Sequence, residues 1–177
     1  MPELQFVPET TQLQEAARLQ ALFDTGALSG EGSREFDDIC ARARSRFKVD
    51  IALVTFLGAE TQFLRGRSGT ELLETPRHEA FCNYTIQSDS VFVVPDTTKD
   101  ARFADYRMVV GPPKIRFYAG APLTYLRGIR LGALCLLDGA PRDFSLGDKS
   151  ELEIMADEVV SIIASLAFDM AHHLPVI

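Results

Sequence analysis

The chain has 177 residues, enough for one domain without a second catalytic module. Its composition is globular, with 46% hydrophobic and 24% charged residues, and its net charge of −7 disfavours nucleic acid and anionic membranes as partners. Three cysteines, without a secretory signal or a long apolar run, argue against a disulfide framework and predict a soluble cytoplasmic protein.

The N-terminal part predicts a short leader followed by two helices. Residues 1–10 carry two prolines and little pattern, so we expect a leader there. Thr11 and Gln14 form a helix start signal, and Gly26 ends this first helix. Ser33 is expected to cap a second helix. Its apolar residues share one face: Phe36, Ile39, Cys40, Ala43 and Phe47.

The next segment predicts a strand pair. Residues 51–57 are apolar except for Thr55, which is typical of a central strand covered on both faces. A turn at 58–60 leads to a second strand at 61–67, and a loop then leads to a helical turn at 77–82.

The second half predicts three more strands around a long connection. A short strand at 91–94 is followed by an irregular, turn-rich stretch with brief helix at 96–113, a length that often marks function. Strands at 115–122 and 131–138 follow. The element order predicts an α+β fold with a largely antiparallel sheet.

The last helix is expected to run from a capping box at Ser145 and Asp148 to about His172, with residues 173–177 as a tail. Its apolar residues form two adjacent stripes, Leu152, Met155, Val159, Ile162 and Leu166, and Ala156, Val160, Ile163, Ala167 and Met170. This arc is wider than one sheet face requires. Either the first helix covers the second stripe, or two chains pair through their terminal helices as a homodimer.

The cysteines offer a thiol hypothesis and a structural alternative. Cys40 and Cys135 lie at core positions, whereas Cys82 follows His78 by four residues, so a His-assisted thiolate and a structural role are both open. Metal-binding spacings, phosphate-binding glycine loops and a nucleophile elbow are absent from the sequence. We therefore expect no catalytic residues and no metal site.

The strand at 115–122 predicts a ligand pocket. Alternation places Arg116, Tyr118 and Gly120 on one face, where charge, hydroxyl and open space combine as in small-molecule sites. We expect three loop residues to complete this site: Cys82, Asp96 and Arg102. Alternatively, Arg116 bridges to Asp96 or Asp100 without a ligand, and the charged loop residues are caps and braces.

The sequence resembles a GAF domain of the type found ahead of bacterial sensor histidine kinases and diguanylate cyclases. The resemblance covers roughly residues 19–166 and rests on the order and spacing of several short motifs. These are Arg77, Phe81-Cys82, Val94-Pro95-Asp96, Asp100, Arg102-Phe103, Arg116 to Gly120, Pro122-Leu123, Gly128, Leu131-Gly132, Leu134-Cys135, Asp138 and Pro141-Arg142. It implies one GAF domain over residues 11–172, with a central antiparallel sheet of five or six strands, a helical layer on one face and ligand-pocket loops on the other.

The resemblance also implies a sensory or regulatory role. The domain would bind a small molecule of unknown identity and signal through its terminal helices to a kinase or cyclase output module, in cis or in trans, as in two-component systems. The alternatives are a ligand-free dimerisation module and a thiol enzyme of the free methionine-R-sulfoxide reductase type. Cys82 is followed by Asn83, so the Cys-His pair typical of bilin-binding members is missing, as is the Asn-Lys-Phe-Asp-Glu signature of the phosphodiesterase type.

Overall fold

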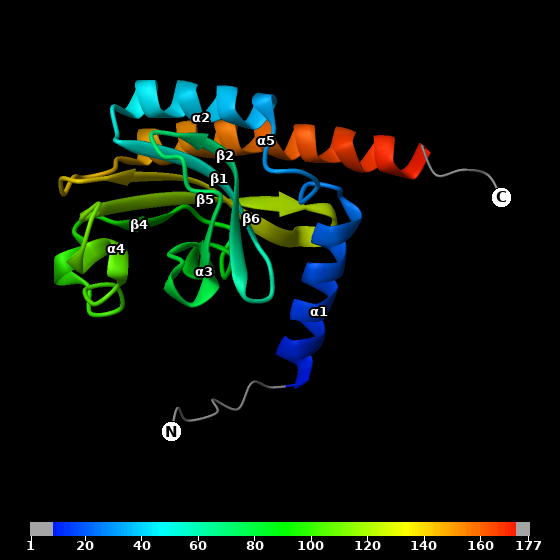
Figure 1. Ribbon diagram of the computed structural model, residues 1–177, viewed down its shortest axis with the longest axis horizontal. Coiled ribbons are helices and arrows are strands. Elements are labelled where there is room, and N and C mark those ends of the chain that lie inside the picture. Colours follow the sequence, from blue (N-terminus) through cyan, green and yellow to red (C-terminus); the bar gives the residue numbers. More distant parts are fainter. Residues whose placement is uncertain (1–8, 173–177) are drawn as a thin grey trace.

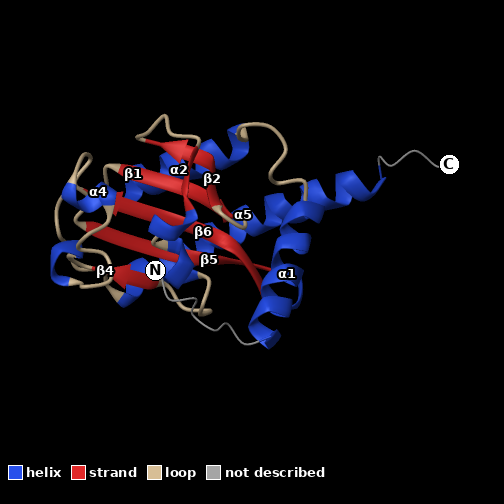
Figure 2. Cartoon of the chain, turned by 60° about the horizontal axis from the view of Figure 1, so that its bottom comes forward, coloured by secondary structure: helices blue, strands red, loops and turns tan. Residues whose placement is uncertain are grey.

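A six-stranded antiparallel sheet organises residues 9–172, the part of the chain that the computed structural model describes. The sheet order is β3-β2-β1-β6-β5-β4 (Figures 1 and 2). The strands are β1 (Ile51–Leu57), β2 (Thr61–Ser68), β3 (Glu74–Pro76), β4 (Phe92–Val94), β5 (Phe117–Tyr125) and β6 (Ile129–Asp138). The α+β class and the antiparallel sheet expected from the sequence are confirmed.

Two of the long helices cover one face of the sheet, and the short ones lie on the other. The α-helices are α1 (Glu9–Asp24), α2 (Arg34–Phe47), α3 (Cys82–Thr85), α4 (Arg107–Val110) and α5 (Leu146–His172). Short 3-10 turns occur at Arg77–Glu79, Thr97–Lys99 and Leu126–Gly128. In Figure 1, α2 and α5 run side by side above the sheet, α3 and α4 lie below it, and α1 stands at one end. No helix within residues 9–172 is both long and apolar enough to cross a membrane.

In the helical layer, α2 packs on the sheet with the apolar face that the sequence predicts. Ser33 caps this helix by accepting a hydrogen bond from the Phe36 backbone N–H at 3.4 Å. The five apolar residues of the predicted face are all buried. Because a Cβ at Gly66 would lie 2.7 Å from the Cβ of Phe36, the missing side chain on β2 allows this close packing.

The strand β1 is buried along its whole length, as predicted. Its side chains alternate between two clusters. Ala52, Val54 and Phe56 pack with the helical layer, whereas Ile51, Leu53 and Leu57 face the side of α3 and α4. This second cluster provides the floor of the candidate site.

Element boundaries differ from the expectations in several places, including the starts of β5 at Phe117 and of β6 at Ile129. The first helix begins at Glu9, inside the predicted leader, while residues 1–8 and the predicted tail at 173–177 lie outside the described residues. The edge strand β3 was missed because three residues carry too short a pattern. The strand β5 continues past Pro122 to Tyr125, and its register with β6 shifts between Pro122 and Thr124, where proline cannot donate to the ladder.

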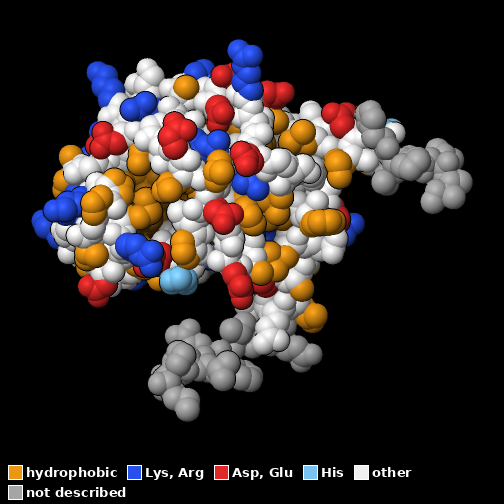
Figure 3. Space-filling model, viewed as in Figure 1, with side chains coloured by type: hydrophobic (Ala, Val, Ile, Leu, Met, Phe, Trp, Pro, Cys, Tyr) orange, Lys and Arg blue, Asp and Glu red, His pale blue; other side chains and the backbone are white. Residues whose placement is uncertain are grey.

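The long helix α5 begins as predicted and leaves part of its apolar surface open. Asp148 N–H donates to the Ser145 hydroxyl, and Ser145 N–H donates to the Asp148 carboxylate. Leu152, Met155, Ala156, Val159 and Ile163 are buried. Towards the end of the helix, Phe168 is 61% exposed, and on α1 Phe23 is 72% exposed. Figure 3 shows hydrophobic side chains along α1 and near the projecting end of α5.

Candidate functional site

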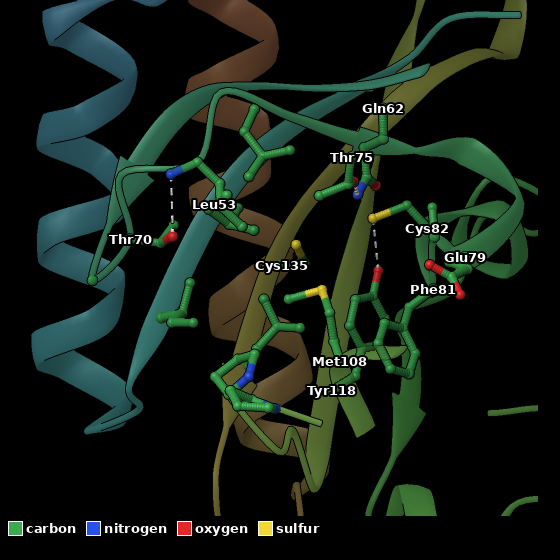
Figure 4. A pocket seen from close by; sticks show the side chains of 18 residues that line it. Leu53, Gln62, Thr70, Thr75, Glu79, Phe81, Cys82, Met108, Tyr118 and Cys135 are labelled. Atoms are coloured by element: carbon green, nitrogen blue, oxygen red, sulfur yellow. Dashed lines mark hydrogen bonds between the residues drawn. The ribbon is translucent and has the colours of Figure 1, made fainter. Parts of the chain in front are cut away.

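A cavity of about 310 Å³ lies on the sheet face opposite α2 and α5 (Figure 4). Its floor comes from β1, β2, β5 and β6, and its walls come from three connections. The lining residues are Ile51, Leu53, Gln62, Leu64, Gly69, Thr70, Leu72, Thr75, Glu79, Ala80, Phe81, Cys82, Met108, Pro112, Pro113, Tyr118, Cys135 and Leu137. The lining is mainly apolar with a few polar groups, which is the usual make-up of a small-molecule site.

Strand alternation explains which side chains reach this cavity. Cys135 and Leu137 lie two residues apart on β6, and Leu53 pairs with Cys135 across the sheet. Tyr118 pairs with Leu137 on the other side of β6. These side chains therefore share one face, and their immediate neighbours along the strands point to the helical layer.

Polar groups gather around the Tyr118 hydroxyl at the inner wall of the cavity. The hydroxyl lies 2.7 Å from the Thr85 hydroxyl and 3.2 Å from the Cys82 thiol. The Cys82 thiol is also 3.3 Å from the Thr55 hydroxyl. The Tyr118 ring stacks on Phe81 with centroids 5.0 Å apart, which fixes the direction of the phenol.

Burial and mutual contact shift the pKa values of Tyr118, Cys135 and Cys82 in different directions. Burial, followed by the charge of a Cys82 thiolate, raises the pKa of Tyr118 well above its ordinary value. The hydrogen bond with Cys82 and burial both raise the pKa of Cys135. Burial also raises the pKa of Cys82, but hydrogen bonds with Cys135, Thr55 and Tyr118 lower it by more. Because the two thiols are in contact, ionisation of one disfavours ionisation of the other.

A second polar group lies on β2. Gln62 Nε2 donates a 3.0 Å hydrogen bond to the Thr75 hydroxyl, whereas Gln62 Oε1 is buried without a partner among the described residues. Sequence reasoning missed Gln62, although a usable signal exists. Gln62 shares its strand face with Leu64, so it is a polar residue at a core-facing position of an alternating strand.

Two of the six predicted site residues, Cys82 and Tyr118, line the cavity. Gly120 is not a lining residue, yet it shapes the site: a Cβ there would lie 2.2 Å from the Tyr118 hydroxyl oxygen. The missing side chain thus leaves room for the phenol to reach Thr85.

Asp96, Arg102 and Arg116 do not line this cavity, and each stabilises the connection between β4 and β5. Asp96 is exposed and accepts hydrogen bonds from the Thr98 N–H and hydroxyl. The Arg116 guanidinium donates to the carbonyl oxygens of Val109 at 2.8 Å and Ile115 at 3.2 Å, so it does not bridge to Asp96 or Asp100.

Arg102 acts as a brace on the outside of the aromatic cluster. Its guanidinium forms an ion pair with Asp100 at 2.7 Å and lies 5.1 to 5.2 Å from the ring centroids of Tyr84, Phe92 and Phe103. The alternative that the charged loop residues are caps and braces therefore describes Asp96 and Arg102.

The structure also tests the predictions made for His78 and Cys40. His78 is exposed, and the groups within hydrogen-bonding distance of Cys82 are those described above, so a His-assisted thiolate is wrong. Cys40 is buried on α2 as expected, and burial raises its pKa to about 12. Within residues 9–172, no group of three or more His, Cys, Asp or Glu side chains is arranged to hold a metal ion.

The cavity wall is linked to α1 through charged side chains. Residues 77–85, the cavity-wall segment, supply four lining residues, from Glu79 to Cys82. Arg77 forms an ion pair with Glu15 of α1 and also donates to the Gly58 carbonyl at 2.8 Å. Glu15 is paired with Arg18 at 2.8 Å as well. Burial raises the pKa of Glu15, but hydrogen bonds from Arg18 and Arg77 outweigh burial and lower it to about 2.

A family model described as the GAF domain matches residues 32–168. A curated relative, a cyclic di-GMP phosphodiesterase of Pseudomonas aeruginosa, is 42% identical to this chain over 149 residues. The aligned region covers 83% of this chain and 25% of the relative, so the chain spans about a quarter of the length of that relative.

Solved structures share the fold at low sequence identity. The GAF domain of an Acinetobacter phosphoenolpyruvate-protein phosphotransferase has a TM-score of 0.60 and 17% identity, covering 85% of this chain and 93% of the other. The PixJ GAF domain of Thermosynechococcus elongatus has the same TM-score and identity, with 93% and 99% covered. A type II free methionine-R-sulfoxide reductase of Thermoplasma acidophilum also scores 0.60, at 13% identity, with 86% and 96% covered.

Proposed function

Because this chain belongs to the GAF domain family, we propose that it is a sensory domain that binds a small molecule and signals through its terminal helices. The observation that carries this proposal is the cavity of about 310 Å³ with its inner polar cluster. Its volume lies at the lower end of the range of small-molecule sites.

The ion pair between Glu15 and Arg77 supports a route from the cavity to α1. Arg77 begins the cavity-wall segment, so a ligand that moves this wall changes the contacts made by Glu15. A ligand can shift an equilibrium between two helix arrangements only by its difference in affinity for them. A coupling free energy of about 1–3 kcal/mol is typical of such domains.

The other terminal helix, α5, packs on the face of β5 and β6 that is opposite to the cavity. Tyr118 and Cys135 face the cavity, whereas Phe117, Ala119, Leu134 and Leu136 on the same strands pack in the cluster that includes α5. Movement of β5 and β6 would therefore change both the shape of the cavity and the packing of α5.

We propose that the output belongs to a kinase or a cyclic-dinucleotide enzyme, linked in cis or in trans. The support is the cyclic di-GMP phosphodiesterase of Pseudomonas aeruginosa, in which a region similar to this chain forms about a quarter of the protein. We also propose that two copies pair through α1 and α5, since Phe23 and Phe168 are exposed on these helices.

Native mass spectrometry of the purified protein tests the ligand proposal. We expect a retained small molecule in the wild-type protein and its loss in Leu53→Phe, which fills the cavity floor. The matched control is Leu146→Phe, the same substitution at an exposed position. Wild-type protein free of any retained molecule and unresponsive to small-molecule screening would support the alternative of a ligand-free dimerisation module.

A further inference from the structure

The amide of Gln62, a residue that lines the cavity, carries an acceptor without a partner. Gln62 is 8% exposed, and its Nε2 is satisfied by the Thr75 hydroxyl at 3.0 Å. Its Oε1 has no hydrogen-bond partner among the described residues. Buried polar atoms are nearly always paired, and one without a partner is costly, so a group from outside is the natural partner for this oxygen. Figure 4 shows Gln62 beside Thr75 at one end of the cavity.

The charges at the cavity disfavour an anionic ligand. Glu79 is the charged side chain of the lining, and the described lining residues include no Lys, Arg or His. A phosphate or carboxylate inside would lose its hydration without gaining a cation, which is strongly unfavourable. The Tyr118 phenol stays neutral because burial raises its pKa, so it adds no charge to the site.

The size of the cavity limits the ligand further. A volume of about 310 Å³ lies at the lower end of the range of small-molecule sites. Cyclic di-GMP, named for the Pseudomonas relative, is a dinucleotide with two phosphates, so it carries the disfavoured charge.

We propose that the cavity takes a small, uncharged, mostly apolar molecule that donates a hydrogen bond to Gln62 Oε1. This inference rests on the proposed function and names the ligand class. Leu53, Leu64 and the ring of Phe81 supply apolar contact, and Gln62 selects for the donor. Gln62 is then the residue that sets specificity, because a ligand lacking a donor leaves the oxygen unpaired.

The test uses three probes of similar shape. Indole carries an N–H donor, benzothiophene is a close isostere without one, and indole-3-acetate adds a negative charge. Binding is followed by the methyl signals of carbon-13-labelled methionine, because Met108 lines the cavity, whereas Met155 lies in the core on the opposite sheet face. We expect indole to shift Met108 more than Met155 and to bind about tenfold more tightly than benzothiophene, with indole-3-acetate weaker than indole.

Two variants distinguish recognition of the ligand by Gln62 from a purely structural role of this residue. Gln62→Met keeps the size of the side chain and removes Oε1, so the preference for indole over benzothiophene should fall to less than about twofold. The thermal midpoint without ligand should change little, because removal of the unpaired buried oxygen offsets the loss of the Nε2 hydrogen bond to Thr75. Thr75→Val is the matched control: it removes the partner of Gln62 Nε2 but leaves Oε1, and the preference for indole should remain.

The outcomes distinguish the ligand class from the proposed function. If benzothiophene binds as tightly as indole, or indole-3-acetate binds best, the ligand class is wrong while ligand binding stands. If Gln62→Met keeps the full preference, Gln62 is not the selecting residue. If none of the three probes shifts Met108, the class is wrong, and the retained molecule sought by native mass spectrometry decides the proposed function separately.

Discussion

Glu15 on α1 forms an ion pair with Arg77, the first residue of the segment that walls the cavity. The same carboxylate is bound by Arg18, whose side chain is buried against the sheet and lies 3.5 Å from the Leu131 carbonyl oxygen. α1 is thus attached to the cavity wall through Glu15 and to β6 through Arg18.

Glu15→Gln should lower the free energy of unfolding by about 1 kcal/mol at pH 7. The lowered pKa of Glu15 implies a larger effect, but a third of its side chain is exposed and solvent screens the pair. Since the folded pKa is about 2 and the ordinary value is 4.5, the contribution is complete above pH ~4.5 and lost as pH falls towards 2. Urea unfolding of both proteins at pH 7 and at pH 3 measures the difference.

The matched control is Asp24→Asn, which removes an exposed carboxylate bonded to Gln20 on the same helix. It should change stability by less than about 0.5 kcal/mol at pH 7. A Glu15→Gln difference that grows on acidification would contradict the assignment.

Gly120→Ala should destabilise the protein by about 1–3 kcal/mol, because the new methyl group overlaps the Tyr118 hydroxyl. Tyr118→Phe removes that hydroxyl and its bonds to Thr85 and Cys82. The double variant should therefore be more stable than the sum of the two single effects predicts. Urea unfolding of the four proteins completes the cycle, and strict additivity would show that Gly120 does not make room for the phenol.

The three cysteines should differ in reactivity. Cys82 has a lowered pKa and lines the cavity, whereas burial raises the pKa of Cys40 to about 12. Timed labelling with methyl methanethiosulfonate at pH 8, read by peptide mass spectrometry, should modify Cys82 first and Cys40 last. Labelling of Cys40 ahead of Cys82 would contradict this order.

The same measurement after mild peroxide treatment tests the thiol-enzyme alternative. Cys82 and Cys135 that stay unmodified and unlinked would exclude that alternative.

The exposed apolar ends of α1 and α5 should mediate pairing of two chains. Sedimentation velocity at high micromolar concentration should give a dimer, and Phe23→Glu combined with Phe168→Glu should shift it to monomer. Leu146→Glu, at an exposed position at the start of α5, should leave the dimer intact. A monomeric wild-type protein under these conditions would rule out the homodimer.

Sequence periodicity predicted the features that depend on regular backbone. The buried face of α2, the central strand β1 and the Ser145 capping box follow from spacing alone, because helix and strand geometry fix where each side chain points. The alternation that placed Tyr118 on the opposite face from Phe117 was correct for the same reason.

The irregular segments could not be predicted in this way. Asp96 and Arg102 lie in a connection whose turns decide side-chain direction, so their use as a cap and a brace follows from three-dimensional contacts. Strand alternation could have identified Gln62 as a polar residue at a core-facing position. That its Oε1 has no hydrogen-bond partner emerges only from the three-dimensional contacts, in which Nε2 is bonded to the Thr75 hydroxyl.

Hydrogen–deuterium exchange of α1 in the presence and absence of saturating indole tests most directly whether cavity occupancy reaches the terminal helices. We predict that indole changes the exchange of α1 amides in the wild-type protein, and that Arg77→Gln abolishes this change while Met108 still reports binding. Indole binding at Met108 without any change in α1 exchange in the wild-type protein would contradict the proposed coupling.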